Sequence, residues 1–167
     1  KNKNDTLDIL NKKYGHLCNP QDFLSRASEL FHKLEFEDGI ALMPYAKECL
    51  EYLKPKYRIA LASSTRNELV IRQLKNANVL EFFEVIVTGD MVLHSKPDPE
   101  IYLKACKELN IPPENCIAIE DSPNGLKRAC FAGLNTIMVP DKIQPNEELN
   151  QFIWKKCDSL KNVMDML

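Results

Sequence analysis

The sequence predicts an α/β fold in which a parallel β-sheet has helices on both faces. From residue 58 onward, short apolar runs alternate with longer segments of helical periodicity. The apolar runs lack the polar alternation of a strand with one solvated face, so they are typical of strands buried on both faces. A strand followed by a helix, repeated about every 20 to 30 residues, indicates parallel strands joined by helical crossovers.

Four apolar runs are the expected strands. Each is rich in β-branched or small apolar residues, which fit a buried parallel sheet. They are RIALAS at 58–63, EVIVTG at 84–89, CIAIED at 116–121 and NTIMVP at 135–140.

The segments between these strands carry apolar residues at helical spacing. One stripe consists of Val70, Leu74 and Ala77, and a second of Tyr102, Ala105, Cys106 and Leu109.

Capping residues mark where these helices begin and end. Thr65 with Glu68 three residues later is a capping-box pattern. Asp98 and Ser122 each precede a proline, which places a capping side chain before proline at the first helical position. Gly133 stands where a left-handed residue would end the last of these helices.

The beginning of the chain has helical patterns and no strand pattern. We expect helices at 6–14, 19–34 and 44–53, the second starting at Asn19 and Pro20. Its apolar stripe is Phe23, Ala27, Leu30 and Leu34. The chain therefore starts as a helical piece, residues 1–40, and continues as an α/β core, residues 41–167.

The composition is that of an ordinary globular protein and argues against several functional classes. With 167 residues, 44% apolar residues and a net charge of −2, the chain has no long block of like charge. This disfavours a nucleic-acid-binding surface. No apolar run approaches the roughly 20 residues of a membrane helix, and the polar N-terminus lacks a signal-peptide core, so we expect no membrane partner.

The cysteines are scattered and form no C-x-x-C pair. We expect buried or half-buried free thiols and a reducing, cytoplasmic location. The three histidines show no metal-ligand spacing, and the oligomeric state is not readable from the sequence. The cysteines are Cys18, Cys49, Cys106, Cys116, Cys130 and Cys157.

Polar residues follow three of the expected strands, where an open parallel sheet binds its ligands. Ser63 and Ser64 follow the first strand at the start of a helix, a position suited to phosphate. Lys96 follows the second strand, and Glu120 and Asp121 end the third. Taken singly, these residues are also typical of helix caps and solvated side chains. Together they predict a phosphate site with Mg²⁺, which takes one or two carboxylates and bridges to substrate phosphate.

Three segments, LASSTRN, SKPDPEIYLKA and IEDSPNGLKRACFAG, resemble motifs two, three and four of the haloacid dehalogenase-like phosphohydrolases. The resemblance is strongest to the branch that contains β-phosphoglucomutase and sugar phosphatases. It implies a Rossmann-like core and identifies residues 1–40 as part of a helical cap domain.

The resemblance also implies roles for individual residues. Ser63 and the Ser64 backbone amide would bind the transferring phosphoryl group, and Asn67 would contact phosphate or substrate. Lys96 would neutralise phosphate oxygens and orient the nucleophile. Glu120 and Asp121 would hold Mg²⁺, which with Lys96 would stabilise the charge of the transition state.

The nucleophile of this family is an aspartate in a D-x-D motif at the end of a first, central strand, and the sequence has no such motif. Asp5, Asp8, Asp38 and Asp90 do not follow a strand in the required way. We therefore expect that the family's first, central strand, which would lie between the strands at 58–63 and 116–120, is missing. We also expect that Lys1 is not the true start of the gene product and that a missing N-terminal segment supplies the nucleophile.

The resulting hypothesis is a Mg²⁺-dependent phosphatase that acts on a small phosphorylated metabolite, such as a sugar phosphate, through an aspartyl-phosphate. This chain alone would be inactive. One alternative is a β-phosphoglucomutase-type phosphomutase, which needs a cap cation, and Arg26 is the nearest basic residue to that place. The other alternative is a phosphate-binding module without turnover.

Overall fold

The structure is a computed structural model that describes residues 3–92 and 98–167. The chain forms two compact units, Lys1–Ala41 and Leu42–Leu167. The first is purely helical in its described part, and the second contains the strands.

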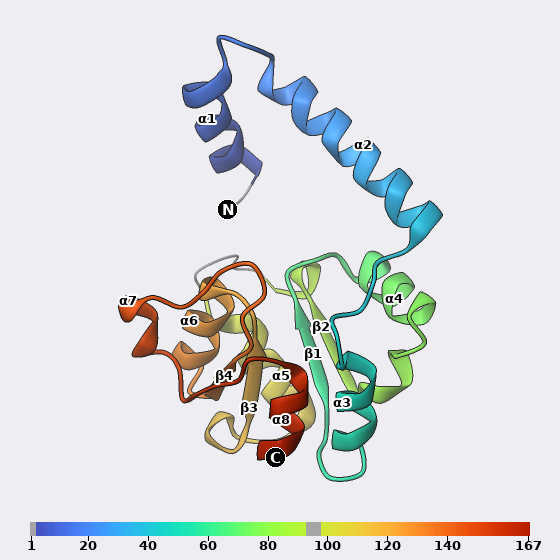
Figure 1. The fold of residues 1–167 in the computed structure, drawn as a ribbon, viewed down its shortest axis with the longest axis vertical. Coiled ribbons are helices and arrows are strands. Elements are labelled where there is room, and N and C mark those ends of the chain that lie inside the picture. The colour runs from blue at the N-terminus through green and yellow to red at the C-terminus, as the bar shows by residue number, and fades with distance from the viewer. Residues whose placement is uncertain (1–2, 93–97) are drawn as a thin grey trace. The chain divides into compact units, whose positions relative to one another are not determined.

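The first unit consists of α1, Lys3–Tyr14, and α2, Pro20–Asp38 (Figure 1). Both helices are confirmed, although α1 begins earlier and α2 ends later than the sequence predicts. The Asn19 side chain accepts a hydrogen bond from the Gln21 backbone N–H at 2.9 Å, which caps α2 as expected. The predicted apolar stripe of α2 is largely exposed, including Phe23 and Leu30.

The second unit contains the four predicted strands, all in parallel pairs. β1, Ala60–Ser63, pairs with β2, Val85–Thr88. β3, Ile117–Glu120, pairs with β4, Asn135–Met138, and β4 also pairs with the short β5, Lys155–Lys156. β5 was not predicted, because two exposed lysines carry no apolar strand pattern.

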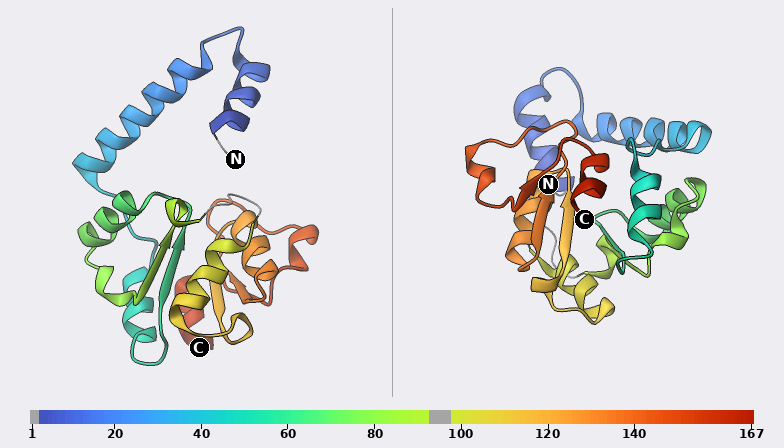
Figure 2. Two further views of the ribbon diagram at one scale, coloured as in Figure 1. Left: turned by 180° about the vertical axis from the view of Figure 1, so that it is seen from behind. Right: turned by 60° about the horizontal axis from the view of Figure 1, so that its bottom comes forward.

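The described strands form two separate sheets, β1–β2 and β3–β4–β5. The strands β1 to β4 are labelled in Figure 1, and Figure 2 shows the same strands from two further sides. β1 and β3 are neighbours in neither sheet. Ile117 and Ile119 of β3 are each 37% exposed. The prediction that all strands are buried on both faces is therefore wrong for β3. These two side chains lie on one face of β3 and belong to neither apolar cluster, and among the described strands β3 pairs with β4 alone.

The helices of this unit follow the strands in the predicted alternation. Those after β1, β2 and β3 are the ones whose stripes and caps the sequence marks. The helices are α3, Ala46–Leu53; α4, Asn67–Asn76; α5, Glu100–Leu109; α6, Pro123–Phe131; α7, Glu147–Asn150; and α8, Leu160–Met166.

Two apolar clusters lie on opposite faces of the strands. One joins α5 and α6 to β2 and β3, with Tyr102, Ala118 and Ala129 among its buried residues. The other joins α3 and α8 to β4, with Leu53 and Ile137 among its members. Helices therefore cover both faces of the strands, and the α/β prediction is confirmed.

Most predicted capping residues act as expected. Ser122 caps α6 by accepting a hydrogen bond from the Gly125 N–H at 3.1 Å, with Pro123 at the first helical position. Asp98 accepts from the Glu100 N–H at 2.9 Å, but it lies two residues before α5 begins, and Pro99, predicted as the first helical residue, directly precedes the helix instead. Gly133 follows α6 with φ of +87°, a conformation that glycine adopts without strain.

The capping box at Thr65 and Glu68 is wrong. α4 begins at Asn67, and the residue before it, Arg66, makes no side-chain cap. The N-terminus of α4 is capped from the next loop, because Asp90 Oδ1 accepts the Asn67 N–H at 3.0 Å. Asp90 Oδ1 also accepts the hydroxyl of buried Thr88 at 2.6 Å. The Thr88 hydrogen bond is the largest cause that holds the Asp90 pKa below its ordinary value.

All six cysteines are free. Cys49, Cys106 and Cys157 are buried, and Cys116 and Cys130 are half-buried, as predicted. Cys18 is exposed, which the sequence did not predict.

None of the helices in the described ranges combines the length and the apolar character that crossing a bilayer requires.

We expect Leu126→Ala to destabilise the protein by about 2–5 kcal/mol, because Leu126 is 0% exposed and its removal leaves a cavity. Urea unfolding followed by circular dichroism measures the change. Leu103→Ala on α5 is the matched control, since Leu103 is 42% exposed and should cost no more than about 0.5 kcal/mol. Equal losses in the two variants would contradict the packing described above.

We expect Asp90→Asn to lower the melting temperature at pH 7, because the charged carboxylate caps α4 at its positive end. The pKa of Asp90 is lower in the folded protein than its ordinary value of 3.8, so its charge stabilises the fold fully at pH values above 3.8. This stabilisation is lost as the pH falls below 3.8 and through the lower pKa of the folded state. Thermal melts of both proteins from pH 7 to pH 2.5 should therefore converge below pH 3.8. Glu81→Gln, at an exposed carboxylate, is the control and should show a smaller difference at pH 7.

Candidate functional site

The candidate site lies where β1 and β3 end. β1 ends at Ser63, and β3 ends at Glu120. Ser64 and Asp121 are the next residues in each case, and both are exposed. Because each strand runs parallel to its partner, each pair of strands presents its polar residues at its carboxyl end.

The loop after β1 is held by local hydrogen bonds and by the loop after β2. Ser63 Oγ accepts the Thr65 N–H at 3.2 Å. The Thr65 carbonyl accepts the Gly89 N–H at 3.0 Å. A Cβ at Gly89 would overlap the Ser64 carbonyl oxygen, so the close approach of the two loops requires glycine there. Asn67, the first residue of α4, is positioned by its bond to Asp90.

Glu120 is half-buried and its carboxylate is held by two hydroxyl groups. The Tyr102 hydroxyl on α5 donates to Glu120 Oε1, and Ser122 Oγ donates to Oε2 at 3.4 Å. Burial raises the pKa of Glu120, the neighbouring Asp121 charge adds to this, and the Tyr102 hydrogen bond opposes it. Burial and the Glu120 charge likewise raise the pKa of Tyr102, so this hydroxyl is protonated and able to donate.

Gly125 leaves the space that the Glu120 carboxylate occupies. A Cβ built at Gly125 would overlap Glu120 Oε2 and the carboxyl carbon. The carboxylate thus lies directly against the backbone of the first turn of α6.

Arg128 on α6 connects the ends of the two separate sheets. Its guanidinium carbon lies 5.9 Å from the centre of the Tyr102 ring. Its Nη1 donates to Ser64 Oγ at 3.4 Å, and its Nε to the Asn124 carbonyl at 3.3 Å. Burial raises the pKa of both Glu120 and Tyr102, and the positive charge of Arg128 opposes this rise.

The structure brings some of the predicted site residues into one region. Ser64 contacts Arg128, Arg128 lies by the Tyr102 ring, and Tyr102 binds Glu120. Lys96 lies outside the described residues.

Sequence reasoning missed three residues of this region: Tyr102, Arg128 and Asp90. Tyr102 was recognised only as part of an apolar stripe, although a buried tyrosine hydroxyl normally needs a hydrogen-bond partner. Arg128 is half-buried and directly precedes the buried Ala129 in α6, a place where a charged side chain also needs partners. For Asp90, no local pattern indicates that it caps α4.

The residues present fit a hard divalent cation. Glu120 and Asp121 offer adjacent carboxylate oxygens, the donors that Mg²⁺ prefers, and Mg²⁺ is often held by only one or two carboxylates. In residues 3–92 and 98–167, no group of three or more His, Cys, Asp or Glu side chains could form a complete protein cage. A cation here would therefore take further ligands from water, substrate or other residues.

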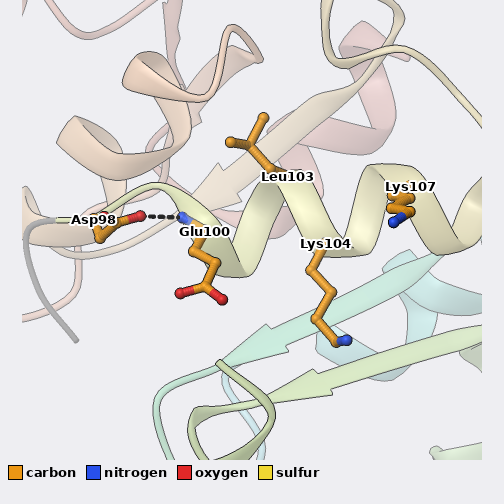
Figure 3. A pocket seen from close by; sticks show the side chains of 5 residues that line it. All are labelled: Asp98, Glu100, Leu103, Lys104 and Lys107. Carbon is orange, nitrogen blue, oxygen red and sulfur yellow. Dashed lines mark hydrogen bonds between the residues drawn. The ribbon is translucent and has the colours of Figure 1, made fainter. Parts of the chain in front are cut away.

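A pocket of about 390 Å³ lies elsewhere, along α5 (Figure 3). In the close-up, Leu103 and Glu100 point to different sides of the helix. Lys104 forms an ion pair with Glu108 at 3.4 Å. The pocket carries charges of both signs and none of the strand-end residues, so we do not assign it to the site. It is lined by Asp98, Glu100, Leu103, Lys104 and Lys107.

Comparisons with known proteins agree with this fold and with the sequence motifs. A phosphorylated carbohydrates phosphatase from Thermotoga maritima is 38% identical over 106 residues, which are 63% of this chain and 49% of that protein. The crystal structure of CbbY from Rhodobacter sphaeroides in complex with phosphate has a TM-score of 0.72 and 34% identity, covering 88% of this chain and 67% of that one. A β-phosphoglucomutase structure from Clostridium difficile has a TM-score of 0.71 and 25% identity, covering 94% and 69%.

The chain spans about half the length of the curated relatives it matches. The family model described as haloacid dehalogenase-like hydrolase matches residues 2–139, which is most of the chain. The chain therefore belongs to the haloacid dehalogenase-like hydrolase family.

Proposed function

We propose that this protein is part of a Mg²⁺-dependent phosphatase that acts on a small phosphorylated metabolite, in the first instance a sugar phosphate. The observation that carries the proposal is the contact chain from Ser64, directly after β1, through Arg128 and Tyr102, to Glu120 at the end of β3. It places hydroxyl groups and backbone amides suited to phosphate in the same region as carboxylates suited to a cation.

Each residue has a distinct task in this proposal. Ser63 and the Ser64 amide bind the phosphoryl group, with Asn67 beside them at the start of α4. Lys96 neutralises phosphate oxygens. Glu120 and Asp121 hold Mg²⁺, which when bound stabilises the negative charge on the transferring phosphoryl group.

The nucleophile in this proposal is an aspartate on a further strand that lies between β1 and β3. The support is the break between the two sheets at this point and the exposure of Ile117 and Ile119, which a neighbouring strand would reduce. The aspartate oxygen would attack phosphorus and release the sugar alcohol, which takes up a proton. Water would then hydrolyse the aspartyl-phosphate to regenerate the carboxylate and release inorganic phosphate.

The substrate class is supported by the relatives. The Thermotoga maritima relative is named for phosphorylated carbohydrates, and the CbbY structure holds phosphate. Residues 1–40 would form part of a helical cap domain in this proposal, and such a domain would select the substrate. The resemblance to β-phosphoglucomutase supports a phosphomutase as the second candidate.

We expect the complete gene product to hydrolyse p-nitrophenyl phosphate in the presence of Mg²⁺ and to lose activity with EDTA. Asp121→Asn should lower kcat about a hundredfold or more, because it removes a charged metal ligand. Phosphate release is measured colorimetrically. Asp165→Asn on α8 is the matched control, since Asp165 is exposed and belongs to a different part of the fold. Absence of Mg²⁺-dependent hydrolysis with any phosphate ester would refute the proposal.

A second assay separates the phosphatase from the phosphomutase. With a sugar 1-phosphate and a sugar bisphosphate activator, we expect release of inorganic phosphate, because water rather than a sugar hydroxyl accepts the phosphoryl group. ³¹P NMR of the products distinguishes the two reactions. Conversion to the sugar 6-phosphate without net phosphate release would establish the mutase instead.

A further inference from the structure

We propose that Tyr102 is a positioning residue that, through its hydroxyl bond to Glu120 Oε1, sets how this carboxylate is presented to a metal ion. This inference rests on the proposed function. It extends that proposal to a residue in α5, outside the strand ends that carry the predicted metal ligands.

The two oxygens of Glu120 are held unequally. Oε1 accepts a hydrogen bond from the Tyr102 hydroxyl, whereas Oε2 has Ser122 Oγ at 3.4 Å, longer than a normal hydroxyl–carboxylate bond. Ser122 Oγ is also engaged in capping α6, where it accepts the Gly125 N–H at 3.1 Å. Ser122 is therefore the weaker of the two described anchors, and Oε2 is the less engaged oxygen.

The Tyr102 ring cannot easily move away from Glu120. Tyr102 is 7% exposed and belongs to the apolar cluster with Ile101, Ala105 and Ala118. The Arg128 guanidinium lies over its ring at 5.9 Å. A rigid donor of this kind limits the rotation of the carboxylate it binds, which is how outer hydrogen-bond partners orient metal ligands.

The apolar packing of Tyr102 does not account for its hydroxyl. A phenylalanine ring would fill the same place in the cluster, and burying a hydroxyl group is unfavourable unless it is hydrogen-bonded. The partner that it has is the carboxylate at the end of β3. Gly125 adds to this constraint, because its missing side chain gives the carboxylate a defined place against α6.

Tyr102→Phe tests the inference, with Mn²⁺ as the probe ion. Free Mn²⁺ is counted by electron paramagnetic resonance while the complete gene product is titrated without substrate. We expect the Kd for Mn²⁺ to rise about tenfold, the lower range for loss of an outer partner of a metal ligand. Tyr57→Phe is the matched control, because it removes a tyrosine hydroxyl bond to the Leu167 carbonyl and should leave the Kd unchanged.

A double variant shows whether Tyr102 acts through Glu120. In the Glu120→Gln background, Tyr102→Phe should cause no further rise in the Kd, since the carboxylate that it positions is absent. A tenfold rise in that background as well would overturn the inference and indicate a general loss of structure. Circular dichroism melts of each variant record such a loss independently.

The outcomes separate this inference from the proposed function. If the unmodified protein binds Mn²⁺ and Tyr102→Phe binds it equally well, the positioning role is overturned while the metal site stands. If the unmodified protein binds no Mn²⁺ and shows no Mg²⁺-dependent hydrolysis, the proposed function and this inference both fail.

Discussion

Parallel pairing of β1 with β2 and of β3 with β4 is the constraint on which the rest of this molecule depends. Two parallel strands cannot be joined by a tight turn, so each connection crosses over through a helix. These helices give the strands cover on both faces, with α5 and α6 on one and α3 and α8 on the other. The same pairing places Ser63 and Ser64, where β1 ends, and Glu120 and Asp121, where β3 ends, at the carboxyl ends of their strands.

Two adjacent carboxylates at the end of β3 need a physical account, because each charge disfavours the other. The structure treats them differently. Asp121 is exposed to solvent, whereas Glu120 is half-buried, hydrogen-bonded to Tyr102 and stabilised as an anion by Arg128. The pKa of Glu120 is nevertheless raised, since desolvation outweighs these favourable contacts. A divalent cation would favour the charged form of both groups, which is the electrostatic reason for placing one here.

The sequence predicted the fold well where its signals were local. The four apolar runs became β1 to β4, and the caps at Asn19, Ser122 and Gly133 formed as expected. Prediction failed where a distant residue replaced a local one. Thr65 has the pattern of a cap for α4, but Asp90, from the loop after β2, occupies that place. Burial of β3 was also overestimated, because exposure depends on which strands lie beside it and not on its own composition.

The sequence by itself determined the order of strands and helices, the family motifs and the polar residues that follow each strand, because these depend on short-range backbone preferences and residue spacing. Only the tertiary structure decided which side chains surround them. Tyr102 and Glu120 are 18 residues apart, and Ser64 and Arg128 are 64 apart. The residues of each pair meet because α5 and α6 pack on the strands. No local sequence pattern encodes the distance between a helix and the end of a strand elsewhere in the chain.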